Sequence, residues 1–149
     1  MNLKAWRRGN AVRRFHTVPR IVTETVGHHS ANVCALMLYI EPGCSRGALV
    51  AALTHDWPEE VTGDVPAPAK WANANLAEAL ALAEEKWAED SAPPPSALVN
   101  EEAKLLKLCD MLDLVLSSID EVNMGNSHAN ELVRNGRLVI SNMEVQESY

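Results

Sequence analysis

The sequence contains no long apolar run. Although 47% of its residues are hydrophobic, no stretch approaches the roughly 18 uninterrupted apolar residues of a membrane-spanning helix. This absence excludes a transmembrane protein, and the apolar content disfavours wholesale disorder. The first residues also lack the apolar segment and small-residue cleavage site of a secretory signal. We therefore expect a cytoplasmic protein with no membrane partner.

Cysteine is scarce. The three cysteines, Cys34, Cys44 and Cys109, are an odd number and do not follow the spacing of metal ligands. Such a set argues against a disulfide framework or a cysteine metal site. We expect reduced thiols in the core of a cytosolic protein.

Acidic residues are absent from the first twenty positions, where six of the thirteen lysines and arginines lie. The net charge of −7 nevertheless argues against a general nucleic-acid-binding protein, which usually has a basic surface. The basic start is open to three interpretations: a transit peptide, a flexible nucleic-acid arm, or arginines that project into a phosphate site. The motifs below favour the third.

Strand-type alternation is also absent, and the apolar pattern is helical nearly throughout. We expect an all-α fold, an irregular bundle of five to seven helices that forms a single domain over residues 1–149. Residues 48–53 are apolar on nearly all sides, which is typical of a helix at the centre of the core. The expected helices cover residues 3–15 (broken near Gly9), 23–40, 47–56, 72–90, 97–122 and 129–141, with a loop at 62–70 and a proline-rich linker at 91–96.

An adjacent histidine and aspartate, His55 and Asp56, end one of these apolar helices. Buried polar groups cost several kcal/mol unless they are satisfied, and a shared divalent cation would satisfy both. Alternatively, Asp56 caps the next helical turn, with Pro58 in its first turn and Glu59 completing a capping box. Capping explains Asp56 and Glu59 but leaves His55 without a role.

Two distant residues could complete a metal site. His29 lies near the start of an upstream helix, and Asp110 interrupts an apolar helix face. A lone histidine on a helix is more often a satisfied core residue, and Asp113, one turn beyond Asp110, is a rival ligand. Together with His55 and Asp56, these residues form a mixed nitrogen and oxygen site. Such a site suits Zn, Mn, Co or Fe(II) better than Mg or Ca.

The order His, His-Asp, Asp resembles the signature of the HD-domain phosphohydrolases. Within that family the match is closest to the 5′-deoxynucleotidases and the phage deoxyadenosine triphosphate triphosphohydrolases. Arg14 and Phe15 match the Arg-aromatic pair of these enzymes, and residues 23–30 are similar to their T-E-x-V-x-E-H-S. Residues 55–70 are similar to their H-D-x-x-E-x-x-T-G-D-x-P-x-P-x-K. The resemblance covers about residues 14–122 and implies a helical bundle of the HD-domain type.

The resemblance also implies roles for the matching residues. It implies four metal ligands, His29, His55, Asp56 and Asp110. It implies a catalytic pair, in which Glu59 positions or deprotonates the attacking water and Asp64 is a second polar group near the phosphate. The implied substrate contacts are Arg14, Lys70 and Lys107 to phosphate and Phe15 and Pro68 to the nucleoside. The sequence departs from the family at His28, where the family often has Glu, and at Phe15, where it often has Trp.

These roles imply an enzyme with one divalent transition metal (Zn, Co or Mn) that hydrolyses the 5′-phosphate ester of deoxynucleotides. Clustered basic residues favour dATP, cleaved to deoxyadenosine and triphosphate, over the alternative of a deoxynucleoside monophosphate 5′-nucleotidase. One alternative is a non-catalytic HD module that binds nucleotides, but such a module has no need of Glu59. Another is a helical nucleic-acid-binding protein, but that function does not explain the motif. We expect no nucleic-acid partner. The high apolar fraction and the resemblance predict a homo-oligomer, a dimer or hexamer.

Overall fold

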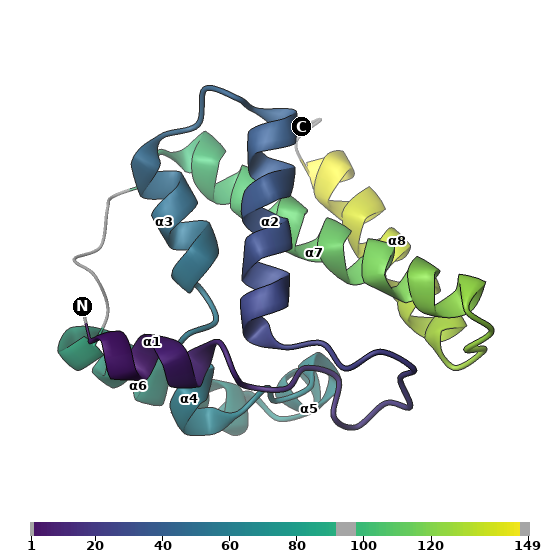
Figure 1. The fold of residues 1–149 in the computed structure, drawn as a ribbon, viewed down its shortest axis with the longest axis horizontal. Coiled ribbons are helices and arrows are strands. Elements are labelled where there is room, and N and C mark those ends of the chain that lie inside the picture. Colours follow the sequence, from purple (N-terminus) through teal and green to yellow (C-terminus); the bar gives the residue numbers. More distant parts are fainter. Residues whose placement is uncertain (1, 92–97, 147–149) are drawn as a thin grey trace.

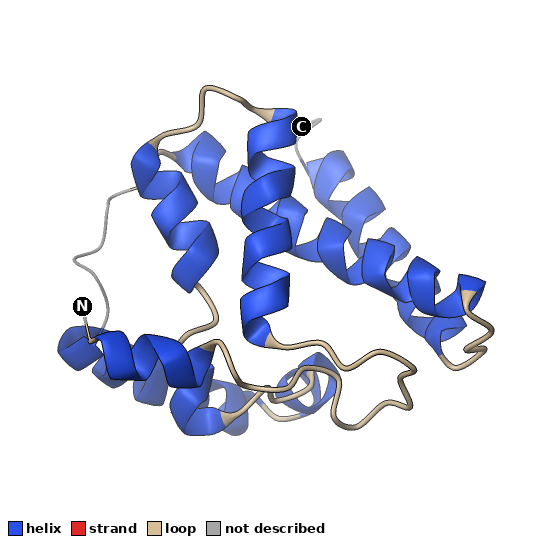
Figure 2. Ribbon diagram, viewed as in Figure 1, coloured by secondary structure: helices blue, strands red, loops and turns tan. Residues whose placement is uncertain are grey.

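The structure is a computed structural model that describes residues 2–91 and 98–146, and every regular element in these ranges is a helix (Figures 1 and 2). The all-α prediction is therefore confirmed, with more helices than the expected five to seven. The helices are α1 (Leu3–Gly9), α2 (Val26–Ile40), α3 (Arg46–Thr54), α4 (Glu59–Thr62), α5 (Ala67–Ala72), α6 (Ala74–Ser91), α7 (Asn100–Asn123) and α8 (Ala129–Gln146).

The main core forms where α2, α3 and α7 meet. Helix α2 packs against both α3 and α7, and α8 covers another side of α7 (Figure 1). The buried side chains between these helices are small or flexible, which lets the helix backbones approach closely. They are Val33 and Met37 of α2, Ala48 and Ala52 of α3, and Cys109 of α7.

A second group of helices, α1, α4, α5 and α6, lies across one end of the bundle (Figure 1). Its buried cluster joins Ala5 of α1, Val26 of α2, Trp87 of α6, and Trp57. Trp57 follows the His55-Asp56 pair directly. Its burial, with only 4% of the residue exposed, therefore anchors the chain beside that pair.

The prediction that α3 lies at the centre of the core is confirmed for one face of the helix only. Ala48 and Ala52 are fully buried in the main core, whereas Leu53 is 41% exposed. Helix α3 contacts α2 and α7, so the two alanines face the bundle and Leu53 lies on the exposed side. An apolar run indicates burial but not how many neighbours a helix has.

The helix boundaries differ from the prediction mainly at prolines and glycines. Helix α5 forms within the expected loop because Pro66 is its N-cap and Pro68 lies in its first turn, where the missing N–H is no loss. Helix α1 ends at Gly9, several residues before the predicted end. The predicted linker 91–96 falls almost wholly outside the described residues, apart from Ser91 at the end of α6.

The predicted thiols are present as free cysteines. Cys109 is buried, and Cys34 and Cys44 are half-buried against the main core. Among the helices within residues 2–91 and 98–146, none combines the length and apolarity needed to cross a bilayer.

Candidate active site

His29 lies in the first turn of α2, where local sequence fixes its position. The Thr25 hydroxyl caps the helix by accepting from the backbone N–H of His28, and Val26 beside it is fully buried. The His29 side chain has no exposed surface, and its Nδ1 lies 2.7 Å from Oδ2 of Asp113. Because a carboxylate accepts this hydrogen bond, Nδ1 carries a proton, and Nε2 is the nitrogen left to bind a metal once its own proton is displaced.

His55 is the C-cap of α3, and the helix also determines its tautomer. Its Nδ1 lies 2.8 Å from the backbone oxygen of Ala52, which can only accept. The proton is therefore on Nδ1, and the lone pair of Nε2 is available to bind a metal. The Nε2 atoms of His29 and His55 are 3.3 Å apart. The two nitrogens thus converge on one point.

Two carboxylates lie beside the same point. Oδ1 of Asp110, from α7, is 3.0 Å from Nε2 of His29 and 4.0 Å from Nε2 of His55. The two oxygens of Asp56 lie 3.6 Å and 3.5 Å from the same two nitrogens. The four residues predicted as metal ligands are therefore brought together from three parts of the chain. Asp113 lies on the other edge of the His29 ring.

This donor set fits a divalent transition metal. Atoms bound to one cation at about 2.1 Å are separated by roughly 3 to 3.5 Å, close to the spacing observed here. Each histidine Nδ1 is held by an acceptor, the arrangement that orients ligating imidazoles. Burial alone would lower the pKa of His29, but hydrogen bonds to Asp110 and Asp113 raise it to about 9. The acidic side chains around His29 thus stabilise positive charge at this point of the site.

The capping interpretation of Asp56 is wrong. The N-cap of α4 is Pro58, and no side chain makes a capping hydrogen bond there. Instead, Oδ2 of Asp56 accepts a 2.8 Å hydrogen bond from Nη1 of Arg14. Asp56 therefore faces the histidines and Arg14 rather than the end of a helix.

A cavity of about 300 Å³ opens beside these residues. It brings together most of the residues predicted to act on substrate, and it adds an apolar wall from α7, α8 and the loop between α1 and α2. The predicted residues that line it are Arg14, Phe15, Asp56, Glu59, Asp64, Pro68, Lys70 and Asp110, and its apolar wall includes Val18, Met111, Leu114 and Leu132.

Glu59 is buried at the cavity, and its Oε2 has no hydrogen-bond partner in the described part of the chain. Burial first, and then the charges of Asp56 and Asp64, raise the pKa of Glu59 to about 8. Such a carboxyl group can take or give a proton near neutral pH. Position and pKa are both those of an acid–base group.

Asp64 has a definite local partner. Its Oδ2 accepts a 2.8 Å hydrogen bond from the backbone N–H of Phe15. Phe15 has a φ of +54°, in the left-handed region that few non-glycine residues adopt. The Asp64 carboxylate thus holds Phe15 in a strained conformation that places it at the cavity.

The remaining basic residues divide between those at the cavity and those away from it. Lys70 of α5 lines the cavity with Arg14, whereas Lys107 is exposed on α7 and is not among the described residues that line it. Arg8 pairs with Glu60 at 3.0 Å. The basic N-terminal segment therefore contributes one arginine, Arg14, to this site.

The sequence interpretation assigned no role to two buried residues near the site, Glu24 and Arg20. Glu24 could have been noticed because it belongs to the matched stretch 23–30. Glu24 also lies close enough to His29 and Asp113 for the three to form a second possible metal group. Glu24 is paired with Arg14 and Arg20, however, so the group with His55 and Asp110 is the better metal site. Leu132 carried no recognisable signal in the sequence.

Comparison with known proteins gives the family of the chain. The sequence model of the YfbR-like 5′-deoxynucleotidase family matches residues 3–93. A 5′-deoxynucleotidase of Photobacterium profundum is 28% identical over 142 residues, which cover 80% of this chain and 73% of that protein.

Solved structures show the same fold. The HD phosphohydrolase DatZ of cyanophage S-2L, bound to dA and one catalytic Zn²⁺ ion, superimposes with a TM-score of 0.70 at 24% identity, covering 96% of this chain and 82% of DatZ. An HD-domain phosphohydrolase of Listeria innocua gives a TM-score of 0.73 at 21% identity, covering 95% and 79%. The chain therefore belongs to the YfbR-like 5′-deoxynucleotidase family of HD-domain phosphohydrolases, metal-dependent enzymes that act on deoxynucleotides.

Proposed function

We propose that this protein is a 5′-deoxynucleotidase that converts a deoxynucleoside monophosphate and water to a deoxynucleoside and inorganic phosphate. The observation that carries this proposal is the charge of the cavity. Only two of the described residues that line it, Arg14 and Lys70, are cationic, and four are acidic: Asp56, Glu59, Asp64 and Asp110. Two cationic side chains suit a substrate with one phosphate group better than a substrate with three phosphate groups.

We also propose that His29, His55, Asp56 and Asp110 hold the metal, which we take to be Zn, Co or Mn. Held by these four residues, a divalent cation would supply polarisation of a phosphoryl oxygen and a lower pKa of bound water. The support is the convergence of the two Nε2 atoms and of two carboxylates. Elemental analysis of purified protein should find about one such metal per chain.

The other residues would act on substrate as follows. Arg14 and Lys70 bind phosphate oxygens and neutralise their charge during transfer. Ionised Glu59 takes a proton from the attacking water as the new oxygen–phosphorus bond forms, and that proton passes to the 5′-oxygen as its bond to phosphorus breaks, which releases the deoxynucleoside. Phe15 and Pro68 at the cavity contact the nucleoside. Lys107, exposed outside the cavity, serves at most as a peripheral contact.

The second candidate is a dATP triphosphohydrolase that releases deoxyadenosine and triphosphate. The observation that favours it is the similarity in fold to DatZ, whose structure holds dA and one catalytic Zn²⁺ ion. The cavity volume of about 300 Å³ is at the small end of ligand pockets, so a triphosphate would extend beyond it. The single arginine at the cavity also weakens the argument from clustered basic residues.

One assay separates these candidates. The protein is incubated with dAMP, dATP, AMP or ATP at equal concentration, with Mn, Co, Zn or Mg in turn, and the products are separated by chromatography. We expect deoxyadenosine and phosphate from dAMP, and slower hydrolysis of AMP. Triphosphate released from dATP at a higher rate would establish the second candidate. Equal rates on AMP and dAMP would remove the preference for deoxyribose.

We further propose that the chain is one domain over residues 1–149 and assembles as a homo-oligomer. Several large apolar side chains are more than half exposed, as is typical of interfaces. They include Tyr39, Trp71, Leu82 and Leu138. Light scattering at micromolar concentration should give a mass at least twice the 16.3 kDa of one chain, and a monomer mass would refute the proposal.

A further inference from the structure

Glu24 is paired with Arg14 through its backbone as well as its side chain. The segments around Arg14 and Glu24 run antiparallel, with a bridge between Arg13 and Thr25. The backbone N–H of Arg14 donates a 3.0 Å hydrogen bond to the backbone oxygen of Glu24. This backbone pairing does not depend on the Glu24 side chain, so the carboxylate can be altered separately.

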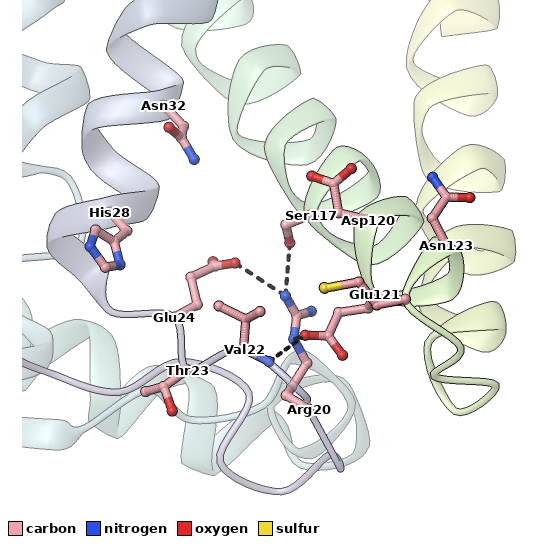
Figure 3. A pocket seen from close by; sticks show the side chains of 11 residues that line it. Arg20, Val22, Thr23, Glu24, His28, Asn32, Ser117, Asp120, Glu121 and Asn123 are labelled. Atoms are coloured by element: carbon pink, nitrogen blue, oxygen red, sulfur yellow. Dashed lines mark hydrogen bonds and ion pairs between the residues drawn. The ribbon is translucent and has the colours of Figure 1, made fainter.

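The Glu24 carboxylate lies between two guanidinium groups and is only 10% exposed. Its Oε1 is 3.2 Å from Nε of Arg14, and its Oε2 accepts a 3.3 Å hydrogen bond from Nη2 of Arg20. Figure 3 shows the Arg20 side chain between Glu24, Ser117 and Glu121. Glu24 therefore links Arg14, which lines the cavity, to Arg20. Arg20 itself is held against α7 by its contacts with Ser117 and Glu121.

Arg14 has two acidic neighbours. Its Nη1 donates a hydrogen bond to Asp56, and its Nε forms a 3.2 Å ion pair with Glu24 that does not have hydrogen-bond geometry, while Arg14 also lines the cavity. A planar guanidinium that is bonded at one nitrogen can still rotate, whereas a second anion beside another nitrogen favours one orientation. The charge of Glu24 thus favours the orientation that turns the Nε edge of Arg14 towards Glu24.

The two arginines need an anion between them. The guanidinium carbons of Arg14 and Arg20 lie 5.3 Å and 4.5 Å from the centre of the same Phe15 ring. Two like charges that pair with the same carboxylate in a buried region repel each other. Glu24 compensates the repulsion, and charges then alternate from Asp56 through Arg14, Glu24 and Arg20 to Glu121.

We propose that Glu24 is a positioning residue that fixes the Arg14 guanidinium for binding the substrate phosphate. The inference rests on the proposed phosphate-binding role of Arg14 and adds to it the residue on which that role depends. Glu24 itself touches no reacting atom. This role also accounts for the presence of Glu24 in the stretch 23–30 that matches the family motif.

The test is a double-mutant cycle with dAMP as substrate. Glu24→Gln keeps the shape of the side chain and removes its charge, and it should lower kcat/KM by about 10- to 100-fold, mainly through KM, as expected for a misplaced binding group. In an Arg14→Ala background the same change should cost less than about 2-fold. Glu60→Gln is the matched control, because it removes a carboxylate that pairs with Arg8 away from the cavity.

Two further measurements make the result decisive. The NMR signal of the Arg14 Nε–H, assigned by its loss in Arg14→Ala, should be sharp in wild type and broadened in Glu24→Gln. If Glu24→Gln does not fold by circular dichroism, Glu24→Asp, which keeps the charge but is one methylene shorter, replaces it. Losses that multiply in the double variant, or an unchanged Arg14 signal, would overturn the inference. A wild-type protein that hydrolyses no deoxynucleotide would refute the proposed function, and the NMR signal would still decide the role of Glu24.

Discussion

Nδ1 of His29 donates a hydrogen bond of 2.7 Å to Asp113, while Nε2 on the other edge of the ring lies 3.0 Å from Asp110. The two aspartates of α7 are one turn apart, and in the sequence Asp113 is the rival of the predicted ligand Asp110. Because they contact opposite edges of the same buried ring, they have different roles. Asp110 lies on the side of His55, and Asp113 orients the imidazole.

This arrangement predicts different effects of the two aspartates on metal binding. Asp110→Ala removes a proposed ligand and should abolish stoichiometric metal at micromolar protein. Asp113→Ala removes only the partner of Nδ1, and loss of such a partner typically weakens metal affinity about 10- to 100-fold. Titration of chelator-treated protein with Zn²⁺ in a competing indicator measures both. Full metal retention in Asp110→Ala, or complete loss only in Asp113→Ala, would reverse the assignment.

Glu59→Gln should nearly abolish turnover. If Glu59 is the base, its loss should lower kcat by roughly 100-fold or more, the range for a general acid–base group, with the metal content unchanged. Initial rates with dAMP and elemental analysis of the same sample provide the measurement. An inactive variant that has also lost its metal would point to a structural role instead.

The same substitution should stabilise the metal-free protein at alkaline pH. The native state holds the Glu59 proton up to a pKa of about 8, because of burial and of the Asp56 and Asp64 charges, whereas an ordinary glutamate releases it near 4.5. The wild-type protein therefore loses stability, relative to the neutral glutamine variant, as the pH rises from 4.5 to 8.

Thermal melts in the presence of chelator test this. Glu59→Gln should melt at a higher temperature than wild type at pH 8 and at about the same temperature at pH 4.5. For a chain of this size, each kcal/mol corresponds to about 2–4 °C. A variant that is less stable at pH 8 would show that the Glu59 carboxylate is satisfied in the native state.

Glu121 should have the opposite dependence on pH. Burial alone would raise its pKa, but hydrogen bonds from Asn126 and from the backbone N–H groups of Ile21 and Val22, with the charge of Arg20, hold the pKa below its usual range. Its stabilising contribution is complete above pH 4.5 and is lost as the pH falls through the lowered pKa.

Glu121→Gln should therefore lower the free energy of unfolding at pH 7 by about 3 kcal/mol or more, as when one partner of a buried ion pair is removed. The difference from wild type should shrink as the pH falls below 4.5 through the lowered pKa, because protonated Glu121 resembles glutamine. Urea denaturation followed by circular dichroism at both pH values gives the comparison. A difference that is the same at both pH values would mean that packing, rather than charge, is the cause.

The sequence predicted much of the fold because its helix signals are local. The cap at Ser45 and the apolar pattern place α2, α3 and α7 within a few residues, although α2 was expected to begin at Thr23 because the cap at Thr25 was not recognised. The short helix α5 was missed because prolines mark both loops and first turns, and sequence alone does not separate the two. The partial exposure of α3 depends on which helices pack against it, which is a tertiary property.

The metal-site residues could be proposed from sequence because each polar side chain interrupts an apolar helix or belongs to a recognisable stretch. The partners of those residues could not. The contacts of Asp113 with His29 and of Glu24 with Arg14 connect separate segments of the chain, and no local pattern specifies them. Lys107 illustrates the reverse case, since its closeness to Asp110 in sequence does not bring it to the cavity.

The last prediction concerns Asp64 and separates its hydrogen bond from its charge. Oδ2 of Asp64 holds the backbone N–H of Phe15, which has the strained φ of +54°. Asp64→Asn keeps an oxygen that can accept this hydrogen bond, whereas Asp64→Ala does not. If the main role of Asp64 is to hold Phe15 at the cavity, the asparagine variant should retain kcat/KM for dAMP within a few-fold, and the alanine variant should lose about 100-fold through misplacement of the nucleoside contact.

A direct role of the Asp64 charge in catalysis would give a different pattern, with similar losses in both variants and a lower kcat rather than a higher KM. The charge also helps to raise the pKa of Glu59, so Asp64→Asn should lower that pKa and move the acid limb of the pH–rate profile to lower pH. Phe15→Ala completes the comparison. If Asp64 acts through Phe15, adding Asp64→Ala to Phe15→Ala should cost little more, and losses that multiply would show that the two residues act separately.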